Sequence, residues 1–232
     1  MTDYDDFTGP GLYPSRWIPA RIPLPTGDAN VPLDPNAELT VGDGELRVRI
    51  PRFSLSHDTF QAVDSPKYLM YATDRFEVPA DRPVTFAVDL AVENIGGDPA
   101  DYRQGMAAFH VFEVEETQRV FAVCGTSTRV LALHEHLGPA DPFYRVAESP
   151  YEDFEDDFGR LRTCEITLDR FRSTASWRVD GRTVYEAAGT LIPDRVQIGF
   201  GIWTMLPIRD GRSQSLRGQG LQARWRRFRV PD

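Results

Sequence analysis

Histidine and glutamate interrupt two segments in which apolar and polar residues alternate. In GMAAFHVFEV, His110 lies at the parity of the apolar residues, and in RVLALHEHL, His134 and His136 follow one face while Glu135 follows the other. Imidazole titrates near neutral pH, so such groups can pass protons to and from a ligand. We predict that these four residues act as general acid–base groups. The alternative is that each imidazole is satisfied by a backbone carbonyl or by water.

The segment HDTFQAVDSPKYLMY contains Lys67, the only lysine of the chain. A lysine ammonium is compact, and its pKa falls readily on burial. The segment is therefore predicted to line the rim of a ligand groove, with Lys67 catalytic and His57, Gln61 and Tyr71 in contact with substrate. In an extended chain, His57 and Gln61 would share one face. The alternative is an Asp-Ser-Pro turn at 64–66 with a surface ion pair.

Trp203 in GFGIWTM has the parity opposite to that of Phe200 and Ile202. Gly199 and Gly201 leave room on its face, which favours a shelf for a flat or sugar-like ligand. Alternatively, the glycines let a neighbouring strand or loop pack over the indole.

Short alternating segments between Gly, Pro, Asp and Asn must position these residues, and this pattern is typical of an all-β, antiparallel sandwich or barrel. Strands are expected at 45–50, 67–78, 84–95, 105–114, 119–125, 129–137, 164–171, 174–181, 182–187, 196–205 and 220–230. No segment predicts an amphipathic helix of three or more turns. Two long connections remain: a proline-rich one at 9–39 that must run extended, and an acidic, aromatic one at 136–161. Each is either a binding loop or the cover of a sheet edge.

The composition predicts one domain over residues 1–232, because 41% of the residues are hydrophobic and β-sandwiches of this length are ordinarily single domains. A net charge of −9 disfavours nucleic acid and anionic membranes as partners. The arginine-rich run RWRRFRV is expected to be the outer face of a final strand.

The N-terminus MTDYDDFTGPG shows neither the basic nor the apolar part of an export signal, and no stretch is apolar enough to cross a bilayer. These features predict a soluble, cytoplasmic protein with Cys124 and Cys164 reduced. Neither cysteine belongs to a CxxC pair, and no metal site is expected. The arginine bias is associated with GC-rich genomes such as those of actinobacteria.

Four stretches carry a resemblance to a known fold: DDFTGPGLYPSRW, SWRVDGRTVYEAAG, QIGFGIWT and the closing strand with Trp225. Together they resemble the concanavalin A-like lectin/glucanase superfamily of jelly-roll sandwiches, and nearly the whole chain is similar to an actinobacterial family within it. The resemblance implies that the opening Asp-Phe strand pairs with the last strand. It also implies a hairpin with Asp180-Gly181 at its turn, which Asp-Gly between alternating segments predicts independently.

Glucanases of this superfamily carry an E-x-D-x-x-E motif on one strand, and retaining glycosidases need two carboxyl groups roughly 5 Å apart. The nearest stretch is FEVEETQ, where Glu113 and Glu115 share a parity. Glu115 replaces the aspartate, and Thr117 or Gln118 stands in place of the last glutamate. An acidic turn explains the stretch without glucanase activity.

These observations favour a cofactor-independent enzyme of specialised metabolism, an isomerase or cyclase that binds a partly apolar small molecule in the concave groove of a jelly roll. The chain lacks a nucleotide-binding glycine loop and the HExxH, GxSxG and EF-hand motifs, so no cofactor is expected. Two alternatives stay open. One is a carbohydrate-binding module or vestigial glycosidase, and the other is a structural or interaction protein.

Overall fold

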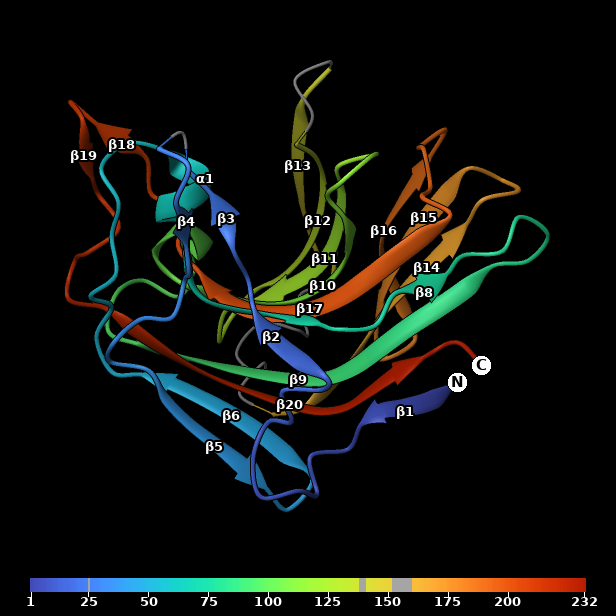
Figure 1. The fold of residues 1–232 in the computed structure, drawn as a ribbon, viewed down its shortest axis with the longest axis horizontal. Coiled ribbons are helices and arrows are strands. Elements are labelled where there is room, and N and C mark those ends of the chain that lie inside the picture. The colour runs from blue at the N-terminus through green and yellow to red at the C-terminus, as the bar shows by residue number, and fades with distance from the viewer. Residues whose placement is uncertain (25, 138–140, 152–159) are drawn as a thin grey trace.

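Two antiparallel sheets form the protein in a computed structural model that describes residues 1–24, 26–137, 141–151 and 160–232 (Figure 1). Sheet A has eight strands. Its order is β16 (Arg182–Ala188), β15 (Thr174–Val179), β14 (Arg162–Asp169), β9 (Val84–Ile95), β20 (Gly220–Val230), β6 (Glu45–Ile50) and β5 (Glu38–Gly42), with β1 (Thr2–Asp5) paired to β20.

Sheet B also has eight strands, and its strands β10 and β17 lie above strands β9 and β20 of sheet A in Figure 1. Its order is β13 (Phe143–Glu148), β12 (Val130–His136), β11 (Arg119–Gly125), β10 (Met106–Glu113), β17 (Arg195–Trp203), β7 (Pro66–Ala72) and β2 (Trp17–Pro19), with β8 (Phe76–Glu77) paired to β17.

Short elements complete the described part of the chain. Two small hairpins pair β3 (Ile22–Pro23) with β4 (Ala29–Asn30) and β18 (Ile208–Arg209) with β19 (Arg212–Ser213). One α-helical turn, α1 (Gln61–Asp64), and one 3₁₀ turn, η1 (Tyr102–Gln104), are present. Neither helix of this part has the length and hydropathy that a bilayer span requires.

The core lies between the facing sheets because alternate side chains of every strand point inward. Phe109, Phe121 and Phe200 of sheet B are fully buried against side chains of sheet A that include Trp177 and Trp225. The Phe200 and Trp225 rings lie 5.0 Å apart between centroids. Cys124 and Cys164 are both buried free thiols.

The two pairings that the resemblance implied are present. Strand β1 pairs antiparallel with β20, with Thr2 opposite Val230. Strands β15 and β16 pair across Asp180 and Gly181, whose φ angles of 49° and 75° are those that a two-residue hairpin turn requires.

Two sequence expectations about connections were wrong. The expected loop 136–161 contains β13, because FYRVAE alternates well enough to pair along the whole of β12. Residues 138–140 and 152–159 of that loop lie outside the described part. The segment around Gln61 turns into α1 instead of running extended, so His57 and Gln61 do not share a strand face.

Sheet B is apolar on its outer face as well, the face directed away from sheet A. A second cluster of buried side chains lies there: Met106, Ala108, Ala122, Cys124, Leu131 and Leu133. Tyr102, Val146, Trp203 and Met205 pack against it and are partly exposed. An outer sheet face of a sandwich is ordinarily polar, so this face is a candidate for ligand contact.

Candidate functional site

Titratable side chains, among them Glu135 and His110, lie on the outer face of sheet B. Glu135 of β12 lies directly between Val120 of β11 and Tyr144 of β13 in the strand register. His110 of β10 lies on the same face in the adjacent row, between Ala122 and Gly199. The structure therefore brings His110 and Glu135 to one face, two strands apart.

Glu135 is the most unusual of these groups. Its side chain is mostly buried, and no hydrogen bond or ion pair joins it to another residue of the described part. Burial raises the pKa of its carboxyl from 4.5 to about 7. Burial likewise raises the pKa of the Cys124 thiol to about 12, with a smaller contribution from the charge of Glu135. A carboxyl group with such a pKa can both donate and accept a proton at neutral pH.

His110 is neutral at physiological pH, because burial lowers the pKa of its imidazole to about 4. Its ring meets the Trp203 indole edge to face, at 5.4 Å between centroids. Nδ1 of His110 and Nε1 of Trp203 are both buried without a hydrogen-bond partner in the described residues. Each ring thus has one buried nitrogen that no other residue of the described part engages.

The aromatic part of this face is packed by the protein's own side chains. Tyr71 and Phe112 contact each other at 4.3 Å between ring centroids, and a Cβ atom on Gly199 would lie 3.0 Å from Tyr71 and 3.2 Å from Phe112. A Cβ atom on Gly201 would lie 3.1 Å from Nε1 of Trp203. The space at the two glycines is therefore occupied by the side chains of Tyr71, Phe112 and Trp203, rather than left open for a ligand. Burial raises the pKa of Tyr71 to about 12.

His134 and His136 lie on the opposite face of β12. The His134 ring stacks on Phe121 at 5.2 Å, and its Nε2 is 3.0 Å from Oγ1 of Thr190. Burial, with a smaller contribution from the charges of two arginines, lowers the pKa of its imidazole to about 4. Nδ1 of His136 is 2.7 Å from the carbonyl oxygen of Asp141. The predicted acid–base set is thus split between two faces, because consecutive strand residues point in opposite directions.

Lys67 lies in a buried polar network at the edge of sheet B. Its ammonium donates to the carbonyl oxygens of Leu55, at 2.7 Å, and of Asp64, and to the Ser215 hydroxyl at 2.9 Å. Nζ is 3.5 Å from Oδ1 of Asp64, whose carboxylate also accepts from Ser213 and Ser215. Burial lowers the pKa of Lys67, and Asp64 opposes that shift. All three ammonium protons are used inside the protein, so neither a groove rim nor a surface ion pair describes this lysine.

His57 and Gln61 belong to the same end of the fold. The His57 amide donates to Asp64 at 2.9 Å. The Gln61 side chain donates to the Leu206 carbonyl at 2.9 Å and accepts from the Ile208 amide at 3.2 Å. These bonds attach α1 to the segment after β17. Strands β17, β10 and β11 separate β7, which follows α1, from Glu135 on β12.

The carboxylates of FEVEETQ form turn contacts. Glu113 accepts hydrogen bonds from the backbone amides of Glu115, Glu116 and Thr117, and Glu115 forms an ion pair with Arg75. This is the acidic turn that was the alternative to a glucanase motif. In the described residues, no group of three His, Cys, Asp or Glu side chains is placed to hold a metal ion.

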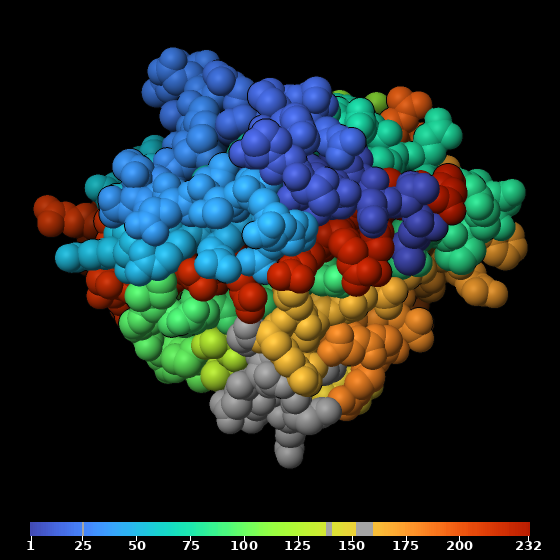
Figure 2. Space-filling view, turned by 90° about the horizontal axis from the view of Figure 1, so that it is seen from below, coloured from blue at the N-terminus to red at the C-terminus, as the bar shows by residue number. Residues whose placement is uncertain are grey.

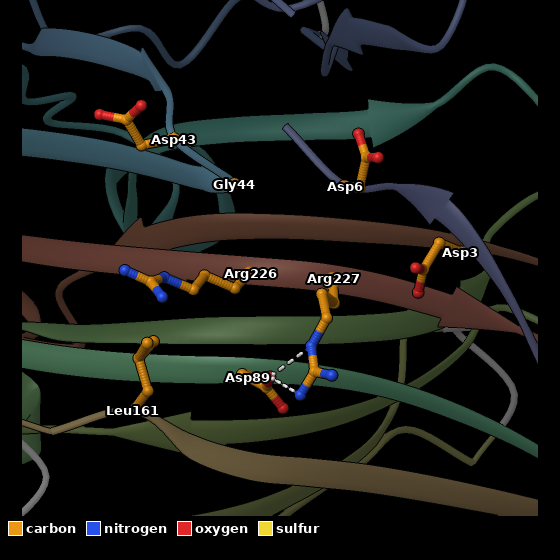
Figure 3. A pocket seen from close by; sticks show the side chains of 8 residues that line it. All are labelled: Asp3, Asp6, Asp43, Gly44, Asp89, Leu161, Arg226 and Arg227. Carbon is orange, nitrogen blue, oxygen red and sulfur yellow. Dashed lines mark hydrogen bonds and ion pairs between the residues drawn. The ribbon is translucent and has the colours of Figure 1, made fainter. Parts of the chain in front are cut away.

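A cavity of about 480 Å³ lies on the outer face of sheet A, the side of the molecule seen in Figure 2. Figure 3 shows Arg227 directed at Asp89, with Asp43 and Asp6 across the cavity. Arg227 donates twice to Asp89, at 2.7 and 3.0 Å, and Arg229 donates to the other carboxylate oxygen. The Asp89 carboxylate is therefore already paired with two arginines. Glu135, which has no such partner in the described residues, is the stronger candidate for proton transfer.

Sequence reasoning missed Tyr144 as a neighbour of Glu135 because it assigned residue 144 to a loop. Burial raises the pKa of the Tyr144 phenol, which stays protonated and can donate. The alternation within FYRVAE was the signal that would have placed Tyr144 on the face of Glu135.

A family model described as "Family of unknown function (DUF6081)" matches residues 4–232. The chain belongs to this family. No curated protein matches the sequence.

Solved structures share the fold over almost the whole chain. A prokaryotic β-1,3-1,4-glucanase (lichenase) derived from a mouse hindgut metagenome is 13% identical, with 99% of this chain and 100% of that one covered and a TM-score of 0.59. The Bacillus licheniformis β-glucanase is 12% identical, with 98% and 96% covered and a TM-score of 0.58. A LamA structure from Zobellia galactanivorans, in complex with laminaritriose and laminaritetraose, is 12% identical, with 97% of each chain covered and a TM-score of 0.61.

At these identities the similarity establishes the fold alone. The fold is the concanavalin A-like jelly-roll sandwich, as the sequence resemblance predicted.

Proposed function

We propose that the outer face of sheet B binds a partly apolar small molecule and that Glu135 transfers protons to and from it. The observation that carries this proposal is the unpaired Glu135 carboxyl, with a pKa of about 7, on an otherwise apolar face. A buried carboxyl without a partner costs stability, and such costs concentrate at functional sites. Val146 on β13 supplies partly exposed apolar surface near it, and Trp203 and Met205 supply more at the far end of the same face.

The reaction class that suits one such carboxyl is an isomerisation or cyclisation. The carboxylate form removes a proton from one atom of the substrate, and the resulting carboxylic acid returns it to another, so no external acid, base or cofactor is consumed. The protonated Tyr144 beside Glu135 can donate a hydrogen bond to a developing oxyanion. Neutral His110 offers an acceptor on the same face, and Trp203 with Tyr71 contributes aromatic surface.

The base-catalysed ring opening of 5-nitrobenzisoxazole tests this proposal. In that reaction a base removes the ring C–H proton, the N–O bond breaks, and a coloured phenolate is released. The native protein is expected to accelerate it, with a rate that rises with pH through about 7 as Glu135 loses its proton. Glu135→Gln should remove at least about nine-tenths of this rate, in line with the contribution of a positioned base. Glu148→Gln, on the same face at the edge strand, is the matched control and should retain the rate. An unchanged rate in Glu135→Gln contradicts the proposal.

Carbohydrate binding is the second candidate, and the fold shared with glucanases favours it. Laminaritriose is the appropriate probe, because the LamA structure contains it. Quenching or enhancement of tryptophan fluorescence by laminaritriose, lost in Trp203→Phe and retained in Glu135→Gln, would favour this candidate over acid–base catalysis. The carboxylates of Glu113 and Glu115, the two that share a parity in FEVEETQ, are both engaged in turn contacts or an ion pair, so binding rather than hydrolysis is expected in that case.

A further inference from the structure

The inner-face ends of β11, β12 and β13 bring basic and aromatic side chains together, on the opposite side of sheet B from Glu135. They form two adjacent cross-strand rows: Arg119, His136 and Phe143 in one, and Phe121, His134 and Arg145 in the other. We call these six residues the Arg–His cluster. Tyr185 of β16 contacts it from sheet A through a 3.1 Å hydrogen bond with Arg145.

The positive charges of the Arg–His cluster have no carboxylate partner in the described residues. The guanidinium of Arg119 lies over the Phe143 ring, with Cζ 5.1 Å from the ring centroid. The guanidinium of Arg145 donates a hydrogen bond to the Tyr185 hydroxyl. Asp141 interacts with Arg119 at long range, but no ion pair joins them. In a protein of net charge −9, two neighbouring arginines without an ion-pair partner in the described residues are an unusual concentration of positive charge.

Two hydrogen-bond donors at or beside the cluster lack a partner in the described residues. Nε of Arg119 and Nε1 of Trp177 are both buried without a partner in the described part of the chain. The fully buried Trp177 ring lies 5.6 Å from His134 and 5.1 Å from Tyr185, so its N–H belongs to this neighbourhood. Nδ1 of His136 is engaged by the Asp141 carbonyl, which makes it the donor of that pair. Donors without acceptors favour a ligand that supplies oxygen acceptors.

We propose that the Arg–His cluster is a binding site for an aromatic anion, a ring that bears a phosphate, sulfate or carboxylate group. The planar guanidinium groups of Arg119 and Arg145 match the geometry of such oxygens, and partly exposed Phe143 and Tyr185 offer ring surface for stacking. The site is separate from Glu135 because residues 134 and 136 point to the face opposite residue 135.

Phenyl phosphate is a suitable probe, read out by the ring C–H signals of the four histidines in ¹H–¹³C NMR spectra. Single His→Gln variants assign the signals. Phenyl phosphate should shift the His134 and His136 signals in a saturable manner and leave the His57 and His110 signals in place. Benzyl alcohol, which has the ring without the charge, should shift none of them. If His134 and His136 do not respond, or if all four signals move together, the proposed site is wrong.

Substitution of Arg119 and Arg145 provides a second test, in which the affinity for phenyl phosphate is measured. Arg119→Gln and Arg145→Gln should each weaken phenyl phosphate binding by about 10-fold or more, because each removes a charged donor. Arg195→Gln, at an exposed ion pair with Glu77 elsewhere on sheet B, is the matched control and should bind as the native protein does. Equal affinity in all three variants overturns the proposal. Thermal unfolding of each variant verifies that the fold is retained.

Discussion

Lys67 and Glu135 are two largely buried charged side chains with opposite surroundings. The Lys67 ammonium has three hydrogen-bond acceptors and a nearby carboxylate, whereas the Glu135 carboxyl has no partner among the residues that the structure describes. A buried ion pair with all its hydrogen bonds made joins segments of the chain. A buried carboxyl without a partner is unfavourable in its charged form, so it binds a proton or a ligand group more readily. Burial of an ionisable side chain therefore indicates a structural role for Lys67 and a candidate functional role for Glu135.

Removal of the Lys67 ammonium is expected to destabilise the fold strongly. Lys67→Met leaves Asp64 buried and uncompensated, which costs about 3–5 kcal/mol of unfolding free energy. Lys67→Arg should also destabilise, because a planar guanidinium cannot direct three donors from one nitrogen to these acceptors. Urea denaturation measures both changes.

The matched control is Arg49→Met, which breaks the exposed pair of Arg49 and Glu38 and should cost less than about 1 kcal/mol. A Lys67→Met protein as stable as Arg49→Met would show that the buried network contributes little.

Parity in the sequence was sufficient to place Glu135 on one face of its strand and His134 and His136 on the other, but it could not relate His110, on another strand, to either face. It could not reveal the surroundings of Lys67, because Ser215 lies 148 residues further along the chain. Nor could it show that Glu135 lacks a partner, since a missing contact is a property of the assembled sheet. Residue chemistry predicts candidates, and tertiary structure decides among them.

At the scale of elements, the strands with the clearest alternation were predicted with their observed bounds. Residues 84–95 and 220–230 are examples. Alternation failed where a strand or turn is short or embedded in loop-like composition: β13 follows a proline in an acidic stretch, and α1 is a single turn. Failure to predict edge strand β13 had the largest effect on the candidate sites, because β13 places Tyr144 beside Glu135 and Arg145 beside His134.

Strand β17 shows how tightly sheet B is packed. A Cβ atom on Gly201 would lie 2.6 Å from the Tyr68 carbonyl oxygen and 3.0 Å from Cδ1 of Leu69. Gly201→Ala should therefore lower the unfolding free energy by about 1–3 kcal/mol through overpacking. The thermal unfolding midpoint reports the change.

Gly11→Ala is the control for that substitution, because no atom lies within 4 Å of the added Cβ and the midpoint should stay in place. If Gly201→Ala is as stable as Gly11→Ala, the space on this face is open rather than filled, and Trp203 is freer to meet a ligand than the structure indicates.

At the scale of the whole molecule, the jelly roll provides two candidate surfaces on the same three strands. The outer face of sheet B combines Glu135 with apolar surface, and the inner-face end combines arginine, histidine and aromatic rings. The fold shared with glucanases does not decide the chemistry, because function depends on the side chains that a scaffold carries. Here those side chains differ from a glycosidase pair of carboxylates.

The protonation of Glu135 is the most direct test of this account. The ¹³C chemical shift of its carboxyl, assigned by its loss in Glu135→Gln, can be followed in the native protein from acid to weakly alkaline pH. The account predicts a midpoint at about 7, raised by burial on the apolar face of sheet B. A midpoint near 4.5, the value of an ordinary glutamate, would show a solvated carboxyl and would contradict the proposed acid–base role.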